Sequence, residues 1–117
     1  METSVVRVRV SDIRPSHQNL KEWMEDERNV YIGRGGVVFI DGKRYPEKAS
    51  IWANPFKVGE SREKCIALYR DYIKRKIRDG EITNTQLEGL RGKRLGCWCK
   101  PEACHGDVLL ELLSSSL

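Results

Sequence analysis

Residues 61–79 carry the pattern that most constrains the fold, an amphipathic helix of about five turns. Apolar side chains recur there every three or four residues and form one stripe: Cys65, Ile66, Tyr69, Tyr72, Ile73 and Ile77. Ser61 is a suitable N-cap, and Gly80 can end the helix in the left-handed conformation. A helix with a single apolar face must bury that face against another layer, so the rest of the chain has to supply one.

Strand patterns lie on both sides of this helix in the sequence. Val and Arg alternate over residues 5–10, which predicts a strand with one solvated face, and residues 29–32 predict a short second strand. Asp41-Gly42 is a favoured two-residue turn, so residues 35–45 predict a β-hairpin. The remaining predicted elements are a strand over 93–99 and helices over 17–27, 84–90 and 106–113.

This order of elements indicates a single α/β domain over residues 1–117. We expect a mixed β-sheet with flanking helices, and a chain that finishes as strand, Cys/His loop and helix. Residues 114–117 are expected to fray. A length of 117 residues suits one hydrophobic core.

Composition excludes several classes of protein. No apolar run approaches the roughly 20 residues of a membrane span, and the first residues lack the pattern of a signal peptide. We therefore expect a protein of the reducing cytoplasm that does not contact a membrane. In such a compartment the four cysteines favour metal binding or catalysis over disulfides.

The net charge of +4 is concentrated in one segment. Residues 61–80 hold seven basic and three acidic side chains, which accounts for the whole excess. Arg70, Lys74 and Arg78 follow one another at four-residue spacing beside the apolar stripe. This row is either a solvated helix face or a contact surface for nucleic-acid phosphates.

The densest chemical signal is the segment from Cys97 to Asp107, Cys-Trp-Cys-Lys-Pro-Glu-Ala-Cys-His-Gly-Asp. Residues at i and i+2 of a strand share a face, so Cys97 and Cys99 should point one way and Trp98 the other.

Three interpretations of this segment remain open. Cys97, Cys99, Cys104 and His105 are suitable zinc ligands. Alternatively, Cys104 at a helix N-terminus is a thiolate nucleophile, assisted by His105 and Asp107. In the third interpretation the cysteines are small buried apolar residues and Asp107 is an acid at the start of a helix.

Two loops add candidate ligand-binding residues. Arg34 lies in a Gly-rich turn whose backbone N–H groups can cradle a phosphate or carboxylate, or this is only a flexible turn after a strand. Residues 50–57 offer Ser50 and Asn54 for a base edge or ribose, Trp52 as a stacking plane, and Lys57. The alternative is a loop held by its aromatic residues, with Asn54 extended before Pro55.

Four blocks occur in order: Tyr31-Ile32-Gly33-Arg34, residues 50–56, residues 61–66 and residues 90–109. In these blocks the chain resembles the family called domain of unknown function 4326, over about residues 30–113. Residues 11–28 and the hairpin look like additions to its shortest members. A fainter similarity, to domain of unknown function 488, shares Cys97, Cys104 and His105. The first resemblance implies one site made of Arg34, Ser50, Trp52, Asn54, Cys97, Cys99, Cys104, His105, Gly106 and Asp107; it names no reaction.

We therefore expect the chain to bind a nucleotide, nucleic acid or other phosphorylated ligand. The Gly-Arg turn, the Ser/Trp/Asn loop and the Cys/His helix start would meet beyond the carboxyl ends of the strands, where α/β sheets usually bind ligands. One alternative is a Cys/His-dependent enzyme acting on a nucleotide-like substrate. Another is a protein-interaction module without catalysis. Zinc is the cofactor that the sequence suggests.

Overall fold

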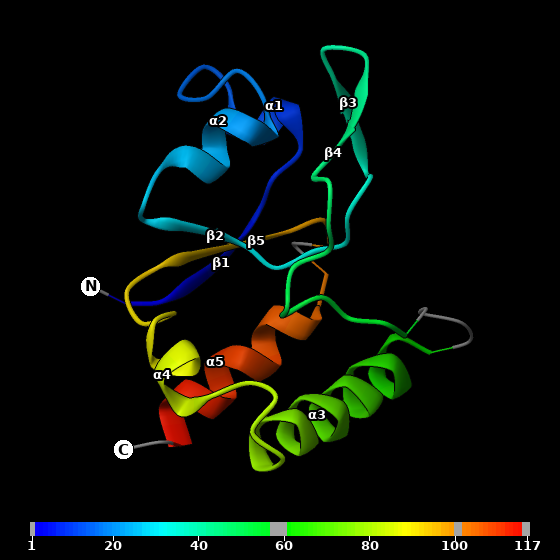
Figure 1. The fold of residues 1–117 in the computed structure, drawn as a ribbon, viewed down its shortest axis with the longest axis vertical. Helices are drawn as coiled ribbons and strands as arrows, with labels where there is room; N and C mark the ends of the chain where they lie inside the picture. The colour runs from blue at the N-terminus through cyan, green and yellow to red at the C-terminus, as the bar shows by residue number, and fades with distance from the viewer. Residues whose placement is uncertain (1, 57–60, 100–101, 116–117) are drawn as a thin grey trace.

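The computed structural model describes residues 2–56, 61–99 and 102–115 (Figure 1). The elements in chain order are β1 (Ser4–Arg7), α1 (Val10–Ile13), α2 (Leu20–Glu25), β2 (Asn29–Tyr31), β3 (Val38–Ile40), β4 (Lys43–Tyr45), α3 (Arg62–Arg78), α4 (Asn84–Glu88), β5 (Arg94–Cys97) and α5 (His105–Ser115).

A three-stranded parallel sheet with the order β1-β5-β2 forms the centre of the fold. The last strand in the sequence is therefore the middle strand, and Leu95 is the register partner of both Val5 and Val30. Strands β3 and β4 pair antiparallel as a separate hairpin, which extends away from the sheet (Figure 1). Parallel and antiparallel pairing with flanking helices confirms the predicted α/β class.

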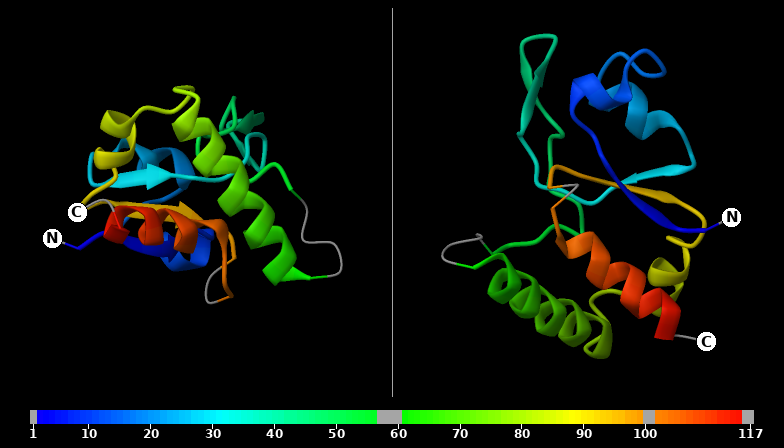
Figure 2. Two further views of the ribbon diagram at one scale, coloured as in Figure 1. Left: turned by 90° about the horizontal axis from the view of Figure 1, so that it is seen from below. Right: turned by 180° about the vertical axis from the view of Figure 1, so that it is seen from behind.

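The strands send alternate side chains into two apolar clusters, one on each face of the sheet. Leu95 and Cys97 belong to the cluster covered by α3, α4 and α5, whereas Tyr31 belongs to the cluster covered by α1 and α2. Figure 2 shows the two helical layers on opposite sides of the sheet. Cys99 packs with the first cluster and Trp98 with the second, which confirms the opposite facing predicted for them.

The long helix and the hairpin form as their sequences predict. The Ser61 hydroxyl accepts the backbone N–H of Lys64 at 3.3 Å and caps α3, while Gly80 has a φ of +80° after its last turn. In the hairpin turn, Asp41 and Gly42 both have positive φ, +53° and +78°. Such a turn matches the natural twist of the two strands.

Other element boundaries differ from the prediction. Strand β1 ends at Arg7 and α1 starts at Val10, because the Arg9 carbonyl accepts the backbone N–H groups of Asp12 and Ile13 and so begins a helical turn. Helix α2 starts at Leu20 rather than residue 17, since the Asn19 side chain caps it.

The two C-terminal helices also depart from their expected limits. Thr83 caps α4 through a reciprocal pair of hydrogen bonds with Gln86, and the helix ends at Glu88 rather than residue 90. Helix α5 continues to Ser115, so two of the four residues expected to fray are helical. In the described ranges we find no helix of the length and apolar character that crossing a membrane requires.

Candidate functional site

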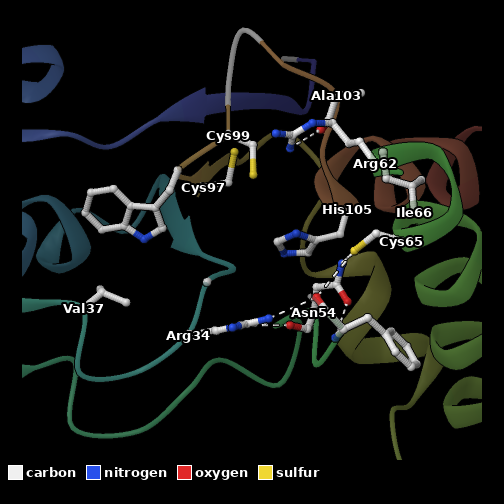
Figure 3. A pocket seen from close by; sticks show the side chains of 13 residues that line it. Arg34, Val37, Asn54, Arg62, Cys65, Ile66, Cys97, Cys99, Ala103 and His105 are labelled. Carbon is white, nitrogen blue, oxygen red and sulfur yellow. Dashed lines mark hydrogen bonds between the residues drawn. The ribbon is translucent and has the colours of Figure 1, made fainter. Parts of the chain in front are cut away.

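A pocket of about 340 Å³ lies beyond the carboxyl ends of β2 and β5 and beside the starts of α3 and α5 (Figure 3). This is the place where parallel α/β sheets usually bind ligands. Its lining residues are Gly33, Arg34, Val37, Asn54, Phe56, Arg62, Cys65, Ile66, Cys97, Trp98, Cys99, Ala103 and His105.

His105 begins α5 and points into the centre of the pocket (Figure 3). Its Nε2 lies 2.7 Å from the carbonyl oxygen of Ile32, and because a carbonyl only accepts, Nε2 carries the proton. Burial lowers the pKa of His105 from its ordinary value, so the ring is neutral at pH 7 and Nδ1 is an acceptor. The edge of the ring packs on Tyr69, with the ring centres 4.9 Å apart.

Cys97 and Cys104 form a buried thiol pair, of which Cys97 lines the pocket. Their sulfur atoms are 3.4 Å apart, and each residue is at most 2% exposed. The hydrogen bond with Cys97, together with burial, raises the pKa of the Cys104 thiol far above its ordinary value. The sequence had suggested a lowered pKa for Cys104, because that argument considered the helix N-terminus and not the neighbouring thiol.

Asp107 serves the start of α5. Its carboxylate accepts the backbone N–H of Cys104 at 3.1 Å, as an acid in the first helical turn commonly does. This contact fits the third interpretation of the segment, in which Asp107 is an acid at the start of a helix.

Of the four side chains suggested for zinc, Cys97 and Cys104 are in contact, and Cys99 and His105 line the same pocket as Cys97. Among the described residues, no group of three or more His, Cys, Asp or Glu side chains is arranged to hold a metal ion. Cys97 and Cys104 contact each other, but Nε2 of His105 is occupied by a carbonyl group. Zinc therefore stays a prediction from the sequence.

Arg34 is bonded to the loop that contains Asn54 and Phe56. Its Nε and Nη2 donate to the carbonyl oxygens of Asn54 and Phe56, at 3.2 and 3.0 Å. The Asn54 side chain accepts the Phe56 N–H at 2.9 Å and donates to the Cys65 sulfur at 3.4 Å. Both predicted residues thus line the pocket, but Asn54 is already bonded to protein through both of its polar atoms.

The other candidates in this loop lie elsewhere. Trp52 is 4% exposed and belongs to the apolar core, where its carbonyl accepts the Tyr69 hydroxyl at 2.7 Å, so it offers no stacking plane. The Ser50 hydroxyl accepts the Trp52 N–H at 3.0 Å and shapes the turn. Lys57 lies outside the described residues.

Arg62 and Cys65 line the pocket and were not predicted for it. Arg62 opens α3 and donates from Nη1 to the Ala103 carbonyl at 3.2 Å, which joins the starts of α3 and α5. The sequence counted Arg62 with the basic segment and Cys65 with the apolar stripe. The available signal was the Ser61 cap, because it identifies residues 62–65 as a helix start.

The basic row on α3 is engaged within the protein. Arg70 makes two hydrogen bonds to the Glu111 carboxylate on α5, at 2.9 and 3.0 Å, and Arg78 contacts Asp79. Of the three, Lys74 remains without an ion-pair partner among the described residues. These contacts favour the interpretation of the row as a helix surface.

Comparison with known proteins gives a family but no activity. A family model with the description "Domain of unknown function (DUF4326)" matches residues 16–115. The chain is also similar to the "Uncharacterized 12.4 kDa protein in nrdA-td intergenic region" of Enterobacteria phage T4, with 44% identity over 68 residues. The match covers 57% of this chain and 63% of the phage protein. No solved structure matches the chain.

Proposed function

The chain belongs to the DUF4326 family, and we propose that its pocket binds a small phosphorylated molecule of about mononucleotide size. The observation that carries this proposal is a pair of guanidinium groups, Arg34 and Arg62, on different walls of one pocket. Figure 3 shows the His105 ring between them.

The two guanidinium groups give the pocket a positive charge. Among the described residues, no carboxylate lies within ion-pair distance of Arg34 or Arg62. Both are instead oriented by backbone carbonyls, which carry no net charge. His105 is neutral at pH 7, and Asp107 already accepts an N–H at the start of α5. The arginines are therefore the groups that attract an anion.

The remaining wall suits an apolar ring. Val37, Phe56, Ile66 and Trp98 line the pocket, and Nδ1 of the neutral His105 can accept a hydrogen bond from a ligand hydroxyl or amine. A volume of about 340 Å³ is at the lower end of the range for small-molecule sites, roughly 300–1,000 Å³. Such a volume favours one nucleotide or sugar phosphate over a polymer.

Calorimetric titration of the full chain tests the proposal. The probes are adenosine 5′-monophosphate, adenosine, inorganic phosphate and a 5′-phosphorylated oligonucleotide. We expect binding of the monophosphate and not of adenosine. Loss of one charged hydrogen bond of about 1.5–3 kcal/mol should weaken binding roughly 10- to 150-fold in Arg34→Gln and Arg62→Gln.

Arg44→Gln is the matched control. Arg44 is an exposed arginine that also donates to a backbone carbonyl, that of Gly36 at 3.1 Å, but it does not line the pocket. It should bind like the unmodified protein. The proposal fails if no phosphate-bearing probe binds, or if all three arginine variants bind equally well. Tighter binding of the oligonucleotide than of the monophosphate would favour nucleic acid as the partner.

A further inference from the structure

We propose that Cys97 and Cys104 form a reversible disulfide with each other, and that a low-molecular-weight disulfide entering the pocket is the oxidant. The inference does not depend on phosphate binding, because it rests on the placement of the two sulfur atoms. It assigns to them a modification that the sequence argued against.

The geometry of the pair favours bond formation. The sulfur atoms are 3.4 Å apart in the reduced protein, and a disulfide is about 2.05 Å long. Oxidation therefore needs the two sulfur atoms to approach each other by about 1.3 Å.

Each sulfur is held by a different rigid element. Cys97 ends the central strand β5, and Cys104 directly precedes α5, so both belong to the core cluster on the same face of the sheet. Six residues separate them in the sequence, and Trp98, Cys99 and Ala103 of this connection line the pocket. A bond between Cys97 and Cys104 would close this part of the pocket wall into a ring.

The position of each thiol relative to the pocket determines which one reacts first. Cys97 lines the pocket and Cys104 does not, so a reagent in the pocket meets Cys97 first. Cys104, 3.4 Å away, is then the second, resolving thiol. Because neither residue is more than 2% exposed, the pocket wall has to open for a reagent to reach the Cys97 sulfur.

The reaction is an ordinary pair of thiol–disulfide exchanges. The Cys97 thiolate attacks one sulfur of the oxidant RSSR, forms Cys97–S–S–R and releases RS⁻. The Cys104 thiolate then attacks the Cys97 sulfur and releases the second RS⁻. Two protons leave the protein thiols, and the two electrons reduce RSSR to two RSH.

The other cysteines are placed differently. The Cys65 sulfur lies 3.4 Å from both the Asn54 amide nitrogen and the Phe56 carbonyl oxygen. Cys99 is half-buried in the same wall as Cys97, which makes it the competing thiol that a test must distinguish.

Mass spectrometry of the folded, full-length protein tests the inference. Reduced protein is equilibrated anaerobically with oxidised and reduced glutathione over a series of ratios and then alkylated. We expect the loss of two hydrogen atoms per chain and a crosslinked peptide pair that joins Cys97 to Cys104. The Cys99→Ser and Cys65→Ser variants should give the same crosslink.

Cys104→Ser supplies the second readout, because it removes the resolving thiol. It should accumulate one glutathione on Cys97. Three outcomes would overturn the inference: four free thiols in the unmodified protein at every ratio, a crosslink that includes Cys99 or Cys65, or a crosslink that forms only in urea. The first readout uses the unmodified protein, so a variant that fails to fold leaves the test intact.

Discussion

Nε2 of His105 donates a hydrogen bond of 2.7 Å to the carbonyl oxygen of Ile32, and this contact joins the start of α5 to the end of β2. The contact has two consequences. It fixes the tautomer of the buried ring, and it leaves Nδ1 unprotonated and able to accept a hydrogen bond.

Stability should depend on the protonation of His105. Its pKa is lower in the folded chain than the ordinary value of 6.5, so the unfolded chain binds the proton more strongly. The free energy of unfolding should therefore fall as the pH is lowered below about 6.5, until the folded-state pKa is reached. Urea unfolding between pH 5 and pH 8 measures this slope.

His105→Gln should lose that part of the pH dependence, since an amide can donate to Ile32 but does not titrate. His17→Gln is the matched control, because His17 is the other of the two histidines, and it should keep the slope. An unchanged slope in His105→Gln would contradict the assignment.

The hydroxyl of Tyr69 should contribute to stability through Trp52. It donates to the Trp52 carbonyl at 2.7 Å inside the core, so Tyr69→Phe leaves that oxygen unpaired. We expect a loss of about 1–2 kcal/mol in the free energy of unfolding. Tyr72→Phe is the control, since none of the described residues bonds to the Tyr72 hydroxyl; a loss equal to that of Tyr69→Phe would be inconsistent with this account.

Gly96 should not tolerate a side chain. A Cβ atom there would lie 2.6 Å from Cγ1 of Val8 and against the ring of Trp23, and both residues are buried. Gly96→Ala should therefore cost about 2–3 kcal/mol by overpacking. Gly89→Ala is the matched control, because Gly89 is exposed and has a φ of −61°. Chemical denaturation compares the two, and equal losses would refute the packing argument.

The ion pair between Arg70 and Glu111 should contribute little to stability. Both side chains are more than a third exposed, so the pair is worth at most about 1 kcal/mol. Arg70→Glu should lose about that amount, and Arg70→Glu/Glu111→Arg should recover most of it. A double-mutant cycle by urea unfolding measures the coupling, and a swap that recovers nothing would show that the pair does not stabilise the packing of α3 on α5.

Local patterns predicted the elements that depend on local interactions. Helix α3 has both its cap and its stripe in the sequence, and the hairpin has Asp41-Gly42 at its turn. The first strand was extended too far, because alternation of Val and Arg continues to Val10 whereas the backbone begins the turn of α1 at Arg9.

Long-range placement was less accessible. The sequence predicted that Arg34, Asn54 and the Cys/His segment would meet beyond the carboxyl ends of the strands. The pocket is lined by residues from all three segments. It could not show that Trp52 is buried, because a loop without periodicity does not tell which side chains face inward. Nor could it show the contact between Cys97 and Cys104, which depends on how β5 and α5 are packed.

Strand β1 keeps β5 in the middle of the sheet. It precedes residue 16, where the family match begins, and its four residues pair with one side of β5. A chain that started at residue 16 would leave that side of β5 as an edge, with a row of unpaired N–H and C=O groups. An extended segment of another molecule can add to such an edge. With β1 in place the edge strands are β1 and β2, so strand addition is directed to them and the pairing of β5 is kept within the chain.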